Sequence, residues 1–113
     1  MAEKITRNEL EALVDRGEVT LVEALGEQYF DKEHLPGAIR VDYDQVDHQA
    51  SERLPDRDAA IVVYCANREC HNSEIAANKL VALGYQNVRR YVEGKADWIE
   101  AGLPVESGVR TQA

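Results

Sequence analysis

Ala59-Ala60-Ile61-Val62-Val63-Tyr64-Cys65 is the stretch that decides the fold of this chain. The run is short, uncharged and rich in β-branched residues, which is typical of a strand buried on both faces of a parallel sheet. A polar loop follows Cys65, and a helix is then expected over 73–83, with Ser73 as its N-cap and Gly84 as its stop. The sequence thus predicts a strand, a loop and a helix in succession, with Cys65 at the carboxyl end of the strand.

Strands and helices alternate along the rest of the chain as well. Thr6-Arg7-Asn8-Glu9 is a capping box that begins a helix, and Gly17 ends it. Alternation of this kind implies parallel strands joined by right-handed crossovers, with helices on both faces, so we expect the α/β fold class. The predicted strands are 19–25, 39–41, 59–65 and 88–92, and the predicted helices are 7–16, 28–33, 44–54, 73–83 and 95–101.

The length of 113 residues suits a single domain, with a core at 6–105 and a flexible C-terminal tail at 106–113. No run approaches the roughly 18 apolar residues that span a bilayer. The N-terminus lacks the charged-then-apolar pattern of a secretion signal, so we expect a cytoplasmic protein. Thiols stay reduced in that compartment, and the two cysteines therefore indicate chemistry rather than a structural disulfide.

The formal net charge of −8 limits the classes of partner. It disfavours nucleic acid and anionic membrane surfaces, which both repel an acidic protein. It does not disfavour a small anionic ligand, because backbone N–H groups at a loop and helix N-terminus attract an anion locally.

Position alone leaves two interpretations of Cys65 open. A free cysteine often behaves as a small buried hydrophobe with no chemistry. Cys65, however, terminates the strand rather than lying within it, and ligand sites in open α/β sheets gather at the carboxyl ends of strands. N–H groups that converge there would push the thiol toward thiolate, which is the nucleophilic form.

Three segments in order carry a more specific signal. They are His34-Leu35-Pro36-Gly37-Ala38-Ile39, then Val62-Val63-Tyr64-Cys65 with the later Leu83-Gly84-Tyr85-Gln86-Asn87-Val88, and finally Glu93-Gly94-Lys95-Ala96-Asp97-Trp98 with Ala101-Gly102-Leu103-Pro104-Val105. Together they resemble the rhodanese-like family of sulfurtransferase domains, which has a His-Ile-Pro-Gly-Ala turn, a cysteine loop and a Gly-Gly-x-x-x-Trp segment followed by Gly-x-Pro. The resemblance runs from about Thr6 to Val105.

The resemblance implies a three-layer domain in which a mostly parallel sheet of about five strands carries helices on both faces. It also implies that Cys65 is the nucleophile, which takes sulfane sulfur from a small anionic donor such as thiosulfate and holds it as a persulfide. The sulfur then passes to a thiol, to cyanide or to a protein acceptor. No cofactor is expected, because the cysteine itself carries the sulfur.

By the same resemblance, the substrate-binding loop consists of the residues that follow Cys65. We expect their backbone amides to stabilise the persulfide anion. The loop residues are Ala66, Asn67, Arg68, Glu69, Cys70, His71, Asn72 and Ser73.

Three loop side chains each have a functional and a structural interpretation. Arg68 is the one formal positive charge in the loop and either binds the anionic donor or is simply solvated. Cys70 is either a resolving thiol that forms a disulfide with Cys65 or a residue without chemistry. His71 is either an acid or base near neutral pH or an ordinary surface histidine. A metal site is not expected, because Cys65, Cys70 and His71 lack a fourth ligand.

The loop departs from the family pattern in two ways. It has seven residues between Cys65 and Ser73, two more than in common members, and Asn72 stands where an arginine usually precedes the serine. Longer loops in this fold resemble those of arsenate reductases and cell-cycle phosphatases, which hold a tetrahedral oxyanion. Oxyanion chemistry is therefore one alternative function, and a non-catalytic binding module is another.

Outside the loop, five residues are singled out. His34 is expected to hydrogen-bond backbone and hold its turn rather than to catalyse. Tyr91 and Trp98 are expected in the core. Glu23 and Glu93 stand where the family often has Asp and Gly, and each change bears on turnover and substrate preference more than on the fold.

Overall fold

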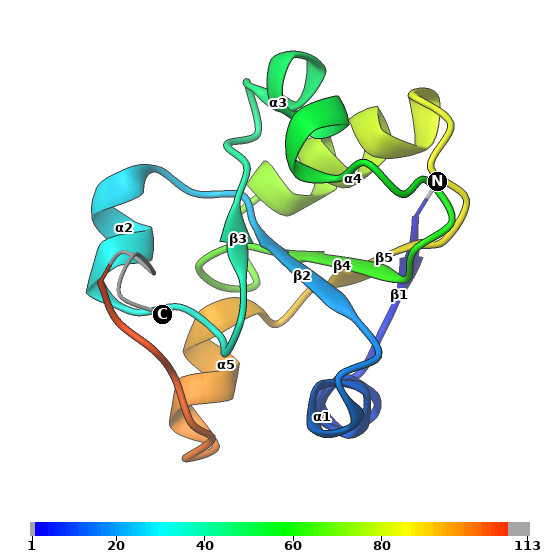
Figure 1. The fold of residues 1–113 in the computed structure, drawn as a ribbon. Helices are drawn as coiled ribbons and strands as arrows, with labels where there is room; N and C mark the ends of the chain where they lie inside the picture. The colour runs from blue at the N-terminus through cyan, green and yellow to red at the C-terminus, as the bar shows by residue number, and fades with distance from the viewer. Residues whose placement is uncertain (1, 109–113) are drawn as a thin grey trace.

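The computed structural model describes residues 2–108. Five strands pair in parallel in the order β1-β5-β4-β2-β3, and Figure 1 shows the sheet running through the middle of the domain. The strands are β1 (Glu3–Lys4), β2 (Thr20–Glu23), β3 (Ile39–Arg40), β4 (Ile61–Tyr64) and β5 (Val88–Tyr91). The α/β class with a parallel five-stranded sheet is confirmed.

Five helices cover the two faces of the sheet. One apolar cluster joins α3 and α4 to one face, and a second joins α1, α2 and α5 to the other, which gives the expected three layers (Figure 1). The helices are α1 (Arg7–Arg16), α2 (Glu27–Lys32), α3 (Val46–Arg53), α4 (Asn72–Ala82) and α5 (Gly94–Glu100). No helix among residues 2–108 is long and apolar enough to cross a membrane.

Local sequence signals act as predicted at the first helix. The Thr6 hydroxyl accepts a hydrogen bond from the Glu9 amide at 3.2 Å, and the Glu9 carboxylate accepts one from the Thr6 amide at 3.0 Å. Gly17 ends the helix with a φ of 66°, in the left-handed region that glycine adopts without steric cost.

The strand pattern was only partly predictable. All four residues of β4 are buried, as its apolar composition indicates. Two-residue β1, by contrast, was missed, because Glu3 and Lys4 are exposed and carry no apolar pattern. Its backbone pairs with Arg89 and Arg90 of β5, which makes it an edge strand of the sheet.

The start of the expected tail differs from the prediction. Glu106 forms an antiparallel bridge with His34, with N–H···O distances of 2.8 Å in both directions, and the Gly108 amide donates to the Asp31 carbonyl at 2.6 Å. The chain up to Gly108 is thus attached to α2 and the turn that follows it. The remaining part of the predicted tail, 109–113, lies outside the described residues.

The parallel register sets the carboxyl ends of three strands side by side. Glu23 of β2 pairs with Tyr64 of β4, and Tyr64 pairs with Tyr91 of β5. Cys65 therefore emerges at the centre of this edge, between two neighbouring strands. Tyr91 and Trp98 are buried and meet edge to face with ring centroids 6.4 Å apart, which confirms the prediction that they belong to the core.

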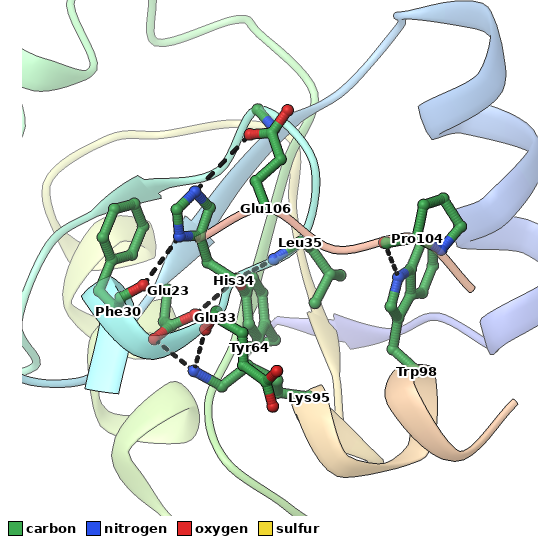
Figure 2. A network of polar contacts seen from close by, with 11 residues as sticks. Glu23, Phe30, Glu33, His34, Leu35, Tyr64, Lys95, Trp98, Pro104 and Glu106 are labelled. Atoms are coloured by element: carbon green, nitrogen blue, oxygen red, sulfur yellow. Dashed lines mark hydrogen bonds and ion pairs between the residues drawn. The ribbon is translucent and has the colours of Figure 1, made fainter. Parts of the chain in front are cut away.

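A buried ion pair ties this edge to α5, as Figure 2 shows. The Lys95 ammonium lies 2.9 Å from the Glu23 carboxylate, and it also donates to the carbonyls of Tyr29 at 3.1 Å and Glu33 at 2.6 Å. Tyr64 donates its hydroxyl to the second Glu23 oxygen at 2.7 Å. The network thus satisfies both charges and joins β2, β4, α2 and α5.

Gly94 allows α5 to approach the cysteine loop closely. Its φ is 77°, and a Cβ at this position would lie 2.8 Å from the Asn67 backbone and from the Cys65 carbonyl oxygen. No side chain fits in that space. The glycine that the resemblance marks therefore has a steric reason: it lets the loop rest directly on the start of α5.

Replacing Gly94 with Ala tests this close approach. We expect Gly94→Ala to lose about 1–2 kcal/mol for a side chain in the left-handed region and a further ~1–3 kcal/mol for displaced loop backbone. Gly102→Ala is the matched control, since Gly102 has a φ of 78° but nothing within 4 Å of the added Cβ. Urea unfolding measures both losses. Equal losses in the two variants would show that the loop does not rest on Gly94.

Candidate functional site

The backbone of Cys65 is fixed from the side of α5. The Cys65 carbonyl accepts a hydrogen bond from the Lys95 amide at 2.8 Å, and the Ala66 carbonyl accepts one from the Ala96 amide at 2.9 Å. The first turn of α5 thus supplies two of its free N–H groups to the loop rather than to solvent. Lys95 serves twice, because its amide holds Cys65 while its side chain holds Glu23.

The Cys65 sulfur is buried, with only 1% of the residue exposed, and it has two polar neighbours. Its thiol donates to the Cys70 carbonyl at 3.4 Å, and the Ser73 amide donates to the sulfur at 3.4 Å. Burial raises the pKa of the Cys65 thiol, and the Cys70 side chain adds to the rise, whereas the Ser73 hydroxyl and amide lower it. The prediction of a lowered pKa is therefore wrong for this thiol, since burial outweighs the N–H groups.

A tight turn occupies the middle of the loop. The Asn67 side-chain oxygen accepts from the Glu69 amide at 3.1 Å, and the Asn67 carbonyl accepts from the Cys70 amide at 3.2 Å. The amides of Glu69 and Cys70 are thus engaged within the turn and do not face the sulfur. Of the loop amides expected to stabilise an anion, Ser73 is the one whose N–H reaches Cys65 Sγ in the described structure.

Ser73 differs from its predicted role. Helix α4 begins at Asn72 with His71 as its N-cap, so Ser73 is the second helical residue and not the cap. The Ser73 side chain is buried, and its hydroxyl accepts a hydrogen bond from Arg90 Nε at 3.0 Å. Sequence reasoning missed Arg90, because it lies on β5, 17 residues away, and only the parallel register brings it to this helix.

Arg68 and His71 of the loop are exposed and pair with carboxylates. Arg68 forms an ion pair with Glu93, and 65% of its side chain is exposed. His71 is 77% exposed and lies 3.6 Å from the Glu74 carboxylate. Cys70 is a half-buried free thiol in the same loop. Arg68 and Glu93 also line a cavity of about 490 Å³ between β1, the start of α1 and the start of α5, which Cys65 does not line.

His34 has the structural role that the sequence predicts. Its Nδ1 lies 2.8 Å from the Phe30 carbonyl, and because a carbonyl only accepts, Nδ1 carries the proton of that bond. The ring is fully buried and stacks on Phe30 with centroids 3.9 Å apart (Figure 2). His34 thus joins α2 to the following turn and takes no part in the cysteine site.

The described residues contain no group of three His, Cys, Asp or Glu side chains placed to hold a metal ion. At the carboxyl edge of the sheet, the Cys65 sulfur has the Ser73 amide and hydroxyl as hydrogen-bond donors.

Comparison with known proteins identifies the family. The sequence model of the Rhodanese-like domain family matches residues 6–101, so the chain belongs to this family. It is 36% identical over 104 residues to the HTH-type transcriptional regulator Rv0324 of Mycobacterium tuberculosis, and the alignment covers 92% of this chain and 45% of the relative. It is 36% identical over 84 residues to the adenylyltransferase and sulfurtransferase UBA4 of Candida albicans, and the alignment covers 69% of this chain and 19% of the relative. The chain thus spans less than half the length of either relative.

Solved structures share the fold at low sequence identity. The BH2092 protein of Bacillus halodurans superposes with a TM-score of 0.85 at 21% identity, over 94% of this chain and 77% of that one. Thiosulfate sulfurtransferase of Pseudomonas aeruginosa superposes with a TM-score of 0.83 at 24% identity, over 96% of this chain and 21% of that one. The rhodanese-like domain of Alr3790 from Anabaena superposes with a TM-score of 0.82 at 23% identity. The superposition covers 100% of this chain and 85% of that one.

The raised pKa of Cys65 leads to a pH-dependent prediction. Alkylation of Cys65 by iodoacetamide should rise with pH and reach its midpoint above the ordinary thiol value of about 8.5. Peptide mapping by mass spectrometry separates Cys65 from Cys70, and the same protein in denaturant provides the ordinary value as a control. The buried thiol also stabilises the fold below the ordinary pKa, and this contribution is lost as pH rises through the folded-state pKa. A midpoint below the denatured value would contradict this electrostatic account.

Proposed function

We propose that this domain is a sulfurtransferase that moves sulfane sulfur from a donor such as thiosulfate to a thiophilic acceptor through a Cys65 persulfide. The observation that carries the proposal is the position of the Cys65 sulfur, which lies at the carboxyl end of the central strand β4 with the Ser73 amide donating to it. Membership of the rhodanese-like family supports it, as do relatives whose names include a sulfurtransferase function.

The reaction has two half-steps. In the first, the Cys65 thiolate attacks the outer sulfur of thiosulfate, a new S–S bond forms to Cys65 Sγ, and sulfite leaves with the electron pair of the broken bond. In the second, cyanide or an acceptor thiolate, on a small molecule or a protein, attacks the outer sulfur, and the Cys65 thiolate leaves. Cys65 ends as it began, so no cofactor takes part in the cycle.

The contacts of the sulfur indicate how the loop would respond. The Cys70 carbonyl accepts a hydrogen bond from the thiol in the resting state, but it would repel a thiolate or a persulfide anion. The loop therefore has to turn this carbonyl away when the sulfur is charged, while the Ser73 amide keeps its place at the start of α4. We expect the first half-step to accelerate with pH, because only the thiolate attacks.

Cys70 is proposed as the resolving thiol. Attack of the Cys70 thiolate on Sγ of the Cys65 persulfide would form a Cys65–Cys70 disulfide and release hydrosulfide, which balances without an outside oxidant. Two free thiols in one loop, with the Cys70 carbonyl 3.4 Å from the Cys65 sulfur, support this assignment. Arg68 remains a proposed donor-binding residue, although it would first have to leave Glu93, and His71 remains a proposed acid or base within the substrate-binding loop.

A second candidate function is a regulatory module without turnover. Two observations favour it: the Cys65 thiol is held protonated by burial, and one relative is an HTH-type transcriptional regulator. In this case the loop would sense sulfur or bind a partner, and the acidic surface makes a protein more suitable than nucleic acid or a membrane. A cytoplasmic location is proposed for either function, since both need reduced thiols.

Mass spectrometry after incubation with thiosulfate tests the proposed function. We expect one added sulfur on Cys65, absent in Cys65→Ser and removed by cyanide with formation of thiocyanate at many turnovers per protein. In Cys70→Ser the persulfide should accumulate, whereas the wild type should also show a Cys65–Cys70 disulfide. Sulfur addition without turnover would favour the regulatory module. No added sulfur would contradict the sulfurtransferase and the sulfur sensor and would leave a partner-binding module. Phosphate release from an aryl phosphate would then indicate the oxyanion alternative.

A further inference from the structure

We propose that Arg90 is a positioning residue that acts on Cys65 through Ser73, in a chain that runs from the Arg90 guanidinium to the Ser73 hydroxyl and on to the sulfur. The inference deepens the proposed function and rests on it, since a persulfide is the anion that the chain would serve. It gives this domain a fixed cation at the cysteine site, supplied by the sheet and not by the loop.

The geometry places three groups in sequence. Arg90 Nε lies 3.0 Å from Ser73 Oγ, and the Ser73 amide lies 3.4 Å from Cys65 Sγ. Ser73 is 1% exposed, so water competes little for its hydroxyl and amide. The backbone of Arg90 is held by β1, because Arg90 pairs with Lys4 and its carbonyl accepts a hydrogen bond from the Ile5 amide at 3.0 Å.

Donor and acceptor chemistry fixes the direction of the chain. A guanidinium only donates, so the Ser73 oxygen must be the acceptor of the bond from Arg90. The hydroxyl proton of Ser73 is then left to donate to another group, and the same residue already donates its amide to the Cys65 sulfur at 3.4 Å. In agreement, the Ser73 hydroxyl lowers the pKa of Cys65, against the larger effect of burial. The guanidinium is a cationic donor, so the chain favours the anionic sulfur.

This arrangement accounts for the missing loop arginine. Asn72 occupies the position before Ser73, and Arg68 is paired with Glu93 at the exposed side of the loop. Arg90 reaches the same serine from β5, opposite Val63 of the central strand. A strand residue is held more rigidly than a loop residue, so this cation keeps its place while the loop moves.

Arg89 offers a matched control on the same strand. Successive strand residues point to opposite faces, so Arg89 lies on the α1 side, where it acts on Glu9, while Arg90 lies on the α4 side. Arg89→Met and Arg90→Met therefore remove the same charge from neighbouring positions, and only the second removes the donor to Ser73. Arg90→Gln removes the charge but places an amide N–H near the former position of Nε.

The test is the midpoint pH of Cys65 alkylation, resolved by peptide mapping. We expect Arg90→Met and Ser73→Ala each to raise the midpoint by roughly 0.5 to 1, which is the effect of one hydrogen bond to an anion. Arg89→Met should leave it unchanged, and Arg90→Gln should restore part of the effect. In the Ser73→Ala background, Arg90→Met should add nothing, because the chain is already broken.

The outcomes separate this inference from the proposed function. An unchanged midpoint in Arg90→Met, or an equal rise with and without Ser73, would overturn the chain. If Arg90→Met does not fold, an unchanged midpoint in Ser73→Ala overturns it equally. Failure of thiosulfate to add sulfur in the wild type would instead contradict the proposed function, whatever the alkylation profiles show.

Discussion

The buried ion pair between Glu23 and Lys95 is the interaction on which the rest of this structure depends. Two charges removed from water are costly unless each is paired and hydrogen-bonded, and here Tyr64 and two carbonyls of the α2 region complete the pairing. The pair holds α5 against the carboxyl edge of the sheet. Because the Lys95 amide also binds the Cys65 carbonyl, the same residue fixes the position of the cysteine backbone.

The site on this frame balances opposing effects on one sulfur. Burial and the Cys70 carbonyl favour the neutral thiol, while the amide and hydroxyl of Ser73 favour the anion. A buried, protonated thiol of this kind is protected from non-specific oxidation, since the thiolate is the reactive form. Burial is the largest of these effects, so a loop movement that exposes the sulfur and turns the Cys70 carbonyl away would favour the thiolate. The loop conformation therefore controls the reactivity of Cys65.

Sequence patterns predicted what depends on local chemistry. The capping box at Thr6, the buried strand β4, the role of His34 and the cysteine at the end of its strand all follow from short stretches of the chain. Contacts between distant segments were not predictable: Lys95 meets Glu23 across 72 positions, and Arg90 meets Ser73 across 17. A glutamate inside an apolar strand was nevertheless a signal, because a buried carboxylate requires a cation. The pKa of Cys65 was mispredicted because its burial is a property of the whole fold.

The claim that the Glu23–Lys95 pair holds the cysteine site is tested most directly with the Lys95→Met variant. Its Cys65 alkylation and its urea unfolding are measured beside those of the Glu23→Gln/Lys95→Met double variant. Removing Lys95 alone leaves the Glu23 carboxylate buried without its cation, so we expect a loss of about 3–5 kcal/mol and markedly faster alkylation in native buffer. The double variant removes the stranded charge and should regain most of the stability. If Lys95→Met unfolds like the wild type and protects Cys65 equally well, the ion pair does not hold the cysteine site, and the account is contradicted.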